Sequence, residues 1–135
     1  MTGETNLKTL LAGLSPVLSP GTFVFATLPP GDPVPATIDP IMIFREQEGT
    51  TLILAEHEAR EADIAATFRC RMITLDIHSS LEGVGFMAAV AARLAQAGIG
   101  VNPVAGFFHD HLFVPADRAD EAMAILGQLA AEHRD

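Results

Sequence analysis

The chain has 135 residues, a size that accommodates one ordinary domain or two small modules and excludes a large multidomain enzyme. With 49% hydrophobic and 19% charged residues, its composition is that of a folded chain rather than a disordered one. Seventeen acidic against eight basic residues give a formal net charge of -9. This charge disfavours nucleic acid and anionic membrane surfaces as partners.

Three further features bear on the cellular compartment. Residues 1–8 (MTGETNLK) lack the basic and then apolar pattern of a signal peptide. The single cysteine, Cys70, makes neither an internal disulfide nor a multi-cysteine zinc site. The alanine-rich stretch 84–97 is interrupted by Arg93 and Gln96 and is shorter than the roughly 20 residues that span a bilayer. We therefore expect a cytoplasmic protein without a membrane segment.

The first half of the chain is predicted to combine one amphipathic helix with strands. The expected elements are a helix over residues 6–14, a strand over 21–28, a hairpin of strands over 41–45 and 51–55, and a helix over 56–66. Seven of the nine prolines lie between Pro16 and Pro40. Because proline removes backbone donors, residues 29–40 are expected to form an extended surface connection.

The second half is predicted to alternate strands and helices. The expected elements are a strand over residues 70–78, a helix over 84–97 closed by Gly98, strands over 99–107 and 112–115, and a helix that Asp117 opens. The strand-helix-strand-strand-helix order is that of a ferredoxin-like βαββα unit without its last strand. The missing strand would leave an unpaired sheet edge, which we expect the other half or a second copy of the chain to cover.

A weak internal repeat links the two halves. Residues 52–62 align with residues 112–122, 60 positions later, with four identities in eleven positions. Both segments are a strand that leads into a helix. We predict an α+β fold of two related halves, residues 1–66 and 67–135, with antiparallel sheets and helices covering one sheet face. The first half is expected to be degenerate, because the proline-rich connection replaces its first helix.

The most informative segment is residues 78–86 (HSSLEGVGF), which joins a strand to a helix. The unbonded amides and the dipole of a helix start favour an anion, and Gly83 and Gly85 leave room for a ligand carboxylate to approach them. An alternative interpretation is that Ser79, Ser80 or Glu82 only caps the helix and the glycines only form the turn. The segment lacks the third glycine or the lysine of the dinucleotide and phosphate-loop fingerprints, and we expect no cofactor.

Residues 78–126 (HSSLEGVGFMAAVAARLAQAGIGVNPVAGFFHDHLFVPADRADEAMAIL) resemble an ACT domain, a small βαββαβ ligand-sensing module, and especially small bacterial tandem-ACT proteins of unassigned function. The resemblance is most specific over residues 72–126 and looser over 5–55. It implies binding of an amino acid or other small effector at an interface between two modules. Carried onto this chain, the implied ligand-binding residues are Leu81, Glu82, Gly83, Val84, Gly85, Phe86, Val101, Asn102 and Pro103.

Two polar features have competing interpretations. The amide of Asn102 could bind a ligand ammonium or carboxylate, or it could bond the local backbone beside Pro103. His109 and His111, two residues apart, could begin a zinc or iron site with Asp110, and Asp76 and His78 could extend it. A metal needs three or more ligands, so a polar hairpin turn is the competing interpretation of the histidine pair, and we expect no metal.

Three functional hypotheses follow. The preferred one is a non-enzymatic regulatory module whose small effector, an amino acid, shifts the arrangement of halves or of subunits in a homodimer, with a separate protein as reader. The second is a structural oligomerisation module that binds no ligand. The third is a metal-assisted hydrolase that uses His109 and His111.

Overall fold

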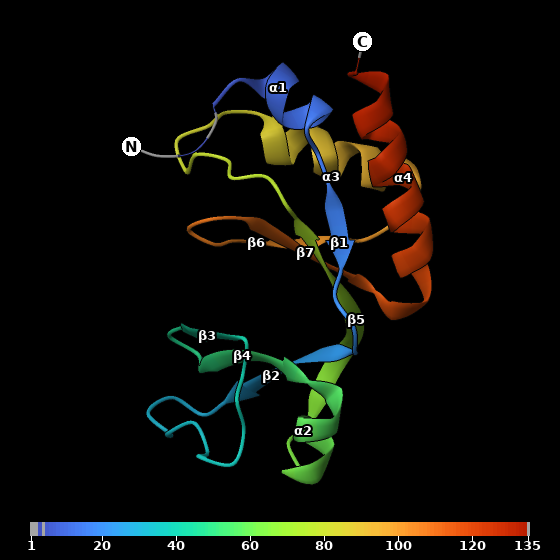
Figure 1. Cartoon of the computed structure of the whole chain (residues 1–135). Coiled ribbons are helices and arrows are strands. Elements are labelled where there is room, and N and C mark those ends of the chain that lie inside the picture. The colour runs from blue at the N-terminus through green and yellow to red at the C-terminus, as the bar shows by residue number, and fades with distance from the viewer. Residues whose placement is uncertain (1–2, 4, 135) are drawn as a thin grey trace. The chain divides into compact units, whose positions relative to one another are not determined.

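The computed structural model describes residue 3 and residues 5–134, and it divides into two compact units (Figure 1). The composite unit comprises Met1–Pro20 and Arg71–Asp135, and the central unit comprises Gly21–Cys70. Part of the polar start, in which the sequence predicts no signal peptide, lies outside the described residues. The halves 1–66 and 67–135 stay a prediction about the order of modules along the chain. In the structure, the segment before Gly21 packs with the residues after Cys70 rather than with the residues that follow it directly in the chain.

The helices and strands follow the predicted order. The helices are α1 (Leu7–Ala12), α2 (Glu56–Glu61), α3 (Phe86–Gln96) and α4 (Ala119–Glu132), the last preceded by a 3-10 turn over Ala116–Arg118. The strands are β1 (Pro16–Leu18), β2 (Phe23–Leu28), β3 (Met42–Arg45), β4 (Thr50–Ala55), β5 (Ala66–Leu75), β6 (Asn102–Ala105) and β7 (Asp110–Pro115). Both hairpins are confirmed, and β1 is the one element that the sequence pattern did not predict.

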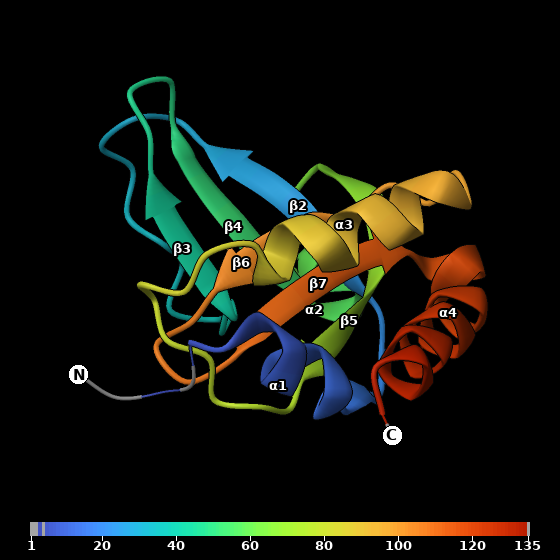
Figure 2. The same cartoon turned by 90° about the horizontal axis from the view of Figure 1, so that it is seen from above.

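In the composite unit, strands β1, β5, β7 and β6 are neighbours in that order. Strand β1 pairs antiparallel with the second half of β5, with Pro16 opposite Leu75 and Leu18 opposite Ile73. Strand β6 pairs antiparallel with β7. Helix α3 packs against α4 and α1 (Figure 2). The unit is therefore ferredoxin-like, and the N-terminal segment supplies its last strand.

The central unit has the strand order β3, β4, β2, β5. Strand β2 pairs with β4 from Phe23 opposite Ala55 to Leu28 opposite Thr50. Helix α2 contacts β4 and β2. Residues 29–41 between β2 and β3 contain neither helix nor strand, as expected from their prolines.

These pairings correct one expectation. The sequence pattern indicated that both halves lack the final strand of the βαββαβ order. Instead, the first half of β5 is the last strand of the central unit, and β1 takes the same place in the composite unit. The described chain thus supplies both missing strands itself.

Strand β5 is irregular in its first half, which belongs to the central unit. Phe23 lies opposite Cys70 while Phe25 lies opposite Thr67, so β5 carries one extra residue between these pairs. Phe68, inside this bulge, has a φ of 56°, which L side chains rarely adopt. Its ring makes an edge contact with the ring of Phe25, with centroids 5.6 Å apart. This contact supports the unusual backbone at Phe68.

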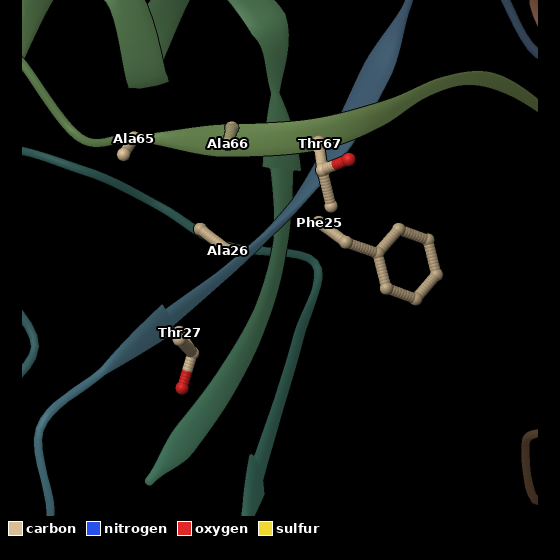
Figure 3. Close-up of a pocket in the computed structure, with 6 residues that line it drawn as sticks. All are labelled: Phe25, Ala26, Thr27, Ala65, Ala66 and Thr67. Atoms are coloured by element: carbon tan, nitrogen blue, oxygen red, sulfur yellow. The ribbon is translucent and has the colours of Figure 1, made fainter.

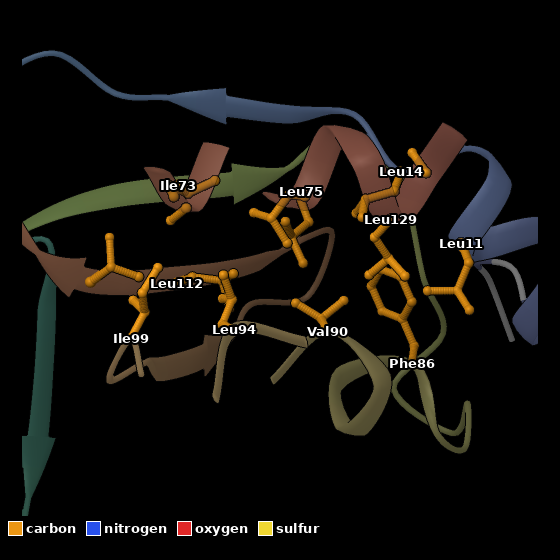
Figure 4. Packing of buried hydrophobic residues seen from close by; sticks show 14 of the residues in the cluster. Leu11, Leu14, Ile73, Leu75, Phe86, Val90, Leu94, Ile99, Leu112 and Leu129 are labelled. Atoms are coloured by element: carbon orange, nitrogen blue, oxygen red, sulfur yellow. The ribbon is translucent and has the colours of Figure 1, made fainter. Parts of the chain in front are cut away.

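The main hydrophobic core lies in the composite unit between its strands and its helices (Figure 4). It combines apolar side chains of β5 and β7 with the inner faces of α1, α3 and α4, including Leu11, Leu14, Ile73, Leu75, Phe86, Val90, Leu94, Ile99, Leu112 and Leu129. A smaller core in the central unit contains Val24, Ala26, Ile38, Leu52, Leu54 and Ala59. Segments 51–60 and 111–120 have the same residue-by-residue burial pattern, which supports the internal repeat.

Some predicted boundaries were wrong. The helix predicted over residues 56–66 ends at Glu61, and Asp63 turns the chain with a φ of 55° before β5 begins. The helix predicted to start at Val84 starts at Phe86. Strand β5 ends at Leu75, so Asp76 and His78 lie in the following loop rather than on a strand.

Cys70 gives a measurable property of this fold. Its side chain is fully buried, its Sγ lies 3.3 Å from the carbonyl oxygen of Phe23, and burial raises the pKa of the thiol to about 11. We expect a thiol reagent at pH 8 to label the native chain about a hundredfold more slowly than the urea-unfolded chain, because so little thiolate forms. Equal labelling rates in both states would contradict this burial.

None of the helices within the described residues combines the length and the hydropathy that crossing a bilayer requires.

Candidate functional site

A cavity of about 170 Å³ lies at the start of α3 in the composite unit. Its walls come from α1, the loop after β5, the first turn of α3 and the β6–β7 connection. The lining residues are Leu10, Ser79, Ser80, Leu81, Gly83, Gly85, Phe86, Met87, Ala88, Ala105, Gly106 and Asp110. The volume is sufficient for a small molecule rather than for a nucleotide.

The first turn of α3 faces this cavity without a cap. Gly85 precedes the helix with a φ of 93° and, being glycine, supplies no side-chain capping hydrogen bond. Helix α3 also has no acidic residue in its first turn. The positive end of the helix dipole is therefore not compensated by a carboxylate of the same helix, which suits an anionic group of a ligand.

The loop after β5 is held by hydrogen bonds of its own. Buried Ser80 accepts the amide of Glu82 at its Oγ over 3.1 Å, and its carbonyl accepts the amide of Gly83 over 3.0 Å. Ser79 Oγ donates to Asp110 Oδ2 over 3.1 Å. The cavity therefore presents helix-start amides on one wall and a carboxylate, Asp110, on another.

The structure brings together part of the predicted ligand site. Leu81, Gly83, Gly85 and Phe86 line the cavity, whereas Glu82 and Val84 point to solvent and do not. The set Val101, Asn102 and Pro103 lies around the start of β6, and it is the other end of β6, at Ala105, that meets the cavity. The full set of nine residues stays a prediction, and its second group would have to come from another module.

Sequence reasoning missed Asp110, Gly106 and Leu10 as parts of the cavity. Leu10 belongs to the leucine stripe of α1, and nothing local indicates that α1 approaches a loop some 70 residues later in the chain. The strand alternation of β7 was a usable signal for Asp110, because it predicts that this side chain faces away from His111. The contacts agree: Asp110 bonds Ser79, while His111 Nδ1 lies 2.9 Å from Thr74 Oγ1.

The two histidines of the pair have different partners. His109 Nε2 lies 3.6 Å from Asp76 Oδ1, and His111 is bonded to Thr74 instead of sharing that position. Across residue 3 and residues 5–134, no three side chains of His, Cys, Asp or Glu come together as metal ligands. The pair lies at the turn between β6 and β7, and its role in metal binding stays untested. His78 contributes a ring contact to this turn, 5.5 Å from the ring of Phe108.

A larger groove of about 400 Å³ lies in the central unit beside the bulge (Figure 3). It is lined by Phe25, Ala26, Thr27, Ala65, Ala66 and Thr67. The two threonine hydroxyls are the polar side-chain groups of this set, and none of its side chains is ionisable. The groove thus offers nothing to orient a charged metabolite, and the smaller cavity at α3 is the better candidate site.

Comparisons with known proteins agree with this architecture. Two family models, both described as an ACT domain, match the chain: one over residues 2–71 and one over residues 67–128. No curated protein sequence matches the chain as a relative.

Solved structures of other proteins share this fold. A Vibrio cholerae protein of unknown function, described as a possible transport protein, is 39% identical, with a TM-score of 0.81 over 92% of this chain and 95% of that one. An Agrobacterium tumefaciens protein is 19% identical, with a TM-score of 0.70 over 82% and 84% of the two chains. The regulatory subunit of aspartate kinase from Thermus flavus is 12% identical, with a TM-score of 0.64 over 86% and 97%.

The two more distant structures show the shared fold alone. The first family model covers just over half of the chain, and the second continues from its end. The observed strand orders in both units are those expected of an ACT domain, an α+β module with an antiparallel sheet. This chain therefore belongs to the ACT-domain family and contains two such domains in tandem.

Proposed function

We propose that the chain is a regulatory module that binds a small zwitterion, an amino acid, in the cavity at the start of α3. The observation that supports this best is the uncapped first turn of α3 facing a cavity of about 170 Å³. The fold similarity to the regulatory subunit of an aspartate kinase is in keeping with a regulatory rather than a catalytic role.

In this proposal the ligand carboxylate lies on the amides of Phe86, Met87 and Ala88. These amides precede the first intrahelical bond, which Ala89 donates to Gly85 over 3.0 Å. The ligand ammonium lies near Asp110, and its side chain packs against Leu81. Asn102, at the far end of β6, would take part only through another module.

Binding would act by population shift. A ligand that prefers one arrangement of the modules, or of two copies in a homodimer, raises the population of that arrangement. Its affinity, for a few charge-assisted hydrogen bonds and one small side chain, is expected to be about micromolar to millimolar. A separate protein would then read the change.

A thermal-shift screen against the twenty amino acids, with nucleotides and divalent metals as comparison compounds, tests this function. We expect one or a few amino acids to raise the melting temperature. Gly83→Asp should abolish the shift, because it places a carboxylate on the cavity wall beside the ligand carboxylate. Gly100→Asp is the matched control: it adds the same charge at a glycine with nothing within 4 Å, outside the cavity, and should leave the shift intact.

The remaining outcomes separate the alternatives. Stabilisation by a divalent metal alone, lost in His111→Ala, would favour the metal-assisted hydrolase. No stabilisation by any compound, together with a stable dimer, would favour the structural oligomerisation module.

One observation favours that second candidate specifically. Edge strand β3 and the residue before it expose Ile41, Ile43 and Phe44, with relative accessibilities of 48%, 50% and 64%. An exposed apolar edge strand is suited to pairing with another chain. If β3 forms a dimer contact, Ile43→Lys should convert the dimer to a monomer in sedimentation analysis, whereas Val17→Lys, on β1, should not.

A further inference from the structure

The β6–β7 connection, residues 106–109, contributes Gly106 to the cavity wall and contacts two imidazoles outside it, His111 and His78. Its first residue, Gly106, lines the cavity, and the amide of Gly106 donates to the carbonyl of His109 over 2.9 Å. The ring of His111 lies close to Gly106: a methyl group added to Gly106 would be 3.4 Å from His111 Nε2. The position of the cavity wall therefore depends on how the His111 ring packs.

The groups that face His111 do not suit a positive charge. On β5, the neighbouring side chain is the neutral hydroxyl of Thr74, 2.9 Å from Nδ1. Among the described residues, no carboxylate lies within ion-pair distance of His111. Asp76, in the loop after β5, instead lies 3.6 Å from His109 Nε2, and the Asp110 carboxylate accepts from Ser79 on the cavity side. Protonation of His111 would thus create a positive charge that is partly buried and has no carboxylate within ion-pair distance.

Burial and the charge of His109 lower the pKa of His111 from its ordinary value of 6.5, and the charge of Asp110 opposes this only in part. A group whose pKa is lower in the closed form than in the open form binds protons more readily when the turn is open. The closed form is therefore fully favoured above about pH 6.5 and loses this advantage as the pH falls below that value. A second feature lowers the stability of the closed turn: His109 Nδ1 is buried without a hydrogen-bond partner.

We propose that protonation of His111 opens the turn at residues 106–109, so that mild acid removes one wall of the cavity at the start of α3. The opening needs no ligand. Its consequence, weaker ligand binding at acid pH, rests on the function proposed above. Phe107 and Phe108, exposed at the tip of the turn and in ring contact with His78, would move with it.

Amide hydrogen exchange of the full chain, followed by NMR from pH 7.5 to 5.5, tests the proposal without any added compound. The protection factor of the Gly106 amide, corrected for the intrinsic exchange rate, is expected to fall by up to about tenfold between pH 7.5 and pH 5.5, the most that a group with an ordinary pKa in the open form can give over this range. The amide of Ile99, which donates to Leu94 in the same unit, is the reference and should keep its protection.

Three variants make the result specific. His111→Asn, or His111→Gln if the first variant does not fold, should remove the pH dependence at Gly106. His78→Asn deletes an imidazole that touches the aromatic tip and should leave that dependence in place. The proposal is overturned if Gly106 protection does not change with pH, if it falls equally in the His111 variants, or if Ile99 loses protection in parallel. A failed amino-acid screen at pH 7.5 would remove the proposed function and leave this exchange result unaffected.

Discussion

Replacing Leu14 by alanine is expected to lower the free energy of unfolding of the composite unit by about 2–5 kcal/mol. Leu14 lies between α1 and β1, its side chain is 1% exposed, and it packs in the main core with Leu75 and Leu129. The cost arises because the short N-terminal segment cannot collapse around the cavity that the missing carbons leave. Urea denaturation followed by circular dichroism measures the change.

Val17→Ala is the matched control for this prediction. Val17 lies on β1, three residues later, but its side chain is half exposed. Its truncation should cost less than about 1 kcal/mol, since little apolar surface is lost from the interior. If both variants lose the same stability, β1 is not an integral strand of the composite unit. Arg134 Nε also donates to the carbonyl of Ala12 over 2.8 Å, so this hydrogen bond helps to hold the N-terminal segment in the composite unit.

Adding one methyl group at Gly49 is expected to destabilise the central unit by about 1–3 kcal/mol. Gly49 lies in the β3–β4 turn, where a Cβ would be 2.6 Å from the carbonyl oxygen of Leu28 and 2.7 Å from Thr27 Oγ1. The carbonyl belongs to the paired strand β2 and cannot move away without disturbing the β2–β4 ladder. Gly49→Ala therefore forces the β3–β4 turn away from β2, whereas most surface Gly→Ala changes displace no strand.

Gly100→Ala provides the comparison. A methyl group there has nothing within 4 Å, so the change should alter stability by less than about 0.5 kcal/mol. Equal denaturation midpoints for Gly49→Ala and Gly100→Ala would show that the β3–β4 turn is free to move away from β2. Wild type and both variants can be compared by chemical denaturation under one set of conditions.

The hairpins and the amphipathic helices could be predicted from the sequence because their signals are local. Residues 51–55 and 112–115 are β-type runs after turns, and three consecutive side chains of each are buried, Leu52, Ile53 and Leu54 in β4 and Leu112, Phe113 and Val114 in β7. The helix at residues 84–97 has a regular apolar stripe, and α3 differs from it by two residues at the start and one at the end. The resemblance to ACT domains over residues 72–126 includes two of these segments, 84–97 and 112–115, and the family comparison confirms it.

The candidate site could be predicted from the sequence only in part. The glycine loop was recognised because Gly83 and Gly85 sit between a strand and a helix, and both line the cavity. The carboxylate on the cavity wall is Asp110, whereas Asn102, which we predicted as a polar partner of the ligand, lies at the other end of β6 and stays a prediction. Which end of a strand meets a loop depends on strand direction within the sheet, and residue spacing alone does not contain that information.

The sequence by itself determined the two-module α+β architecture, the absence of a first helix in the central unit, and the glycine-containing loop before α3. These follow from apolar periodicity, proline and glycine, which act on neighbouring residues. Only the tertiary structure decided that β1 completes the composite unit and that β5 serves both units. Strand β1 has three residues and begins with proline, so it has little strand propensity of its own. It exists because β5, more than 50 residues later, offers backbone partners and because Leu14 beside it is buried in the core.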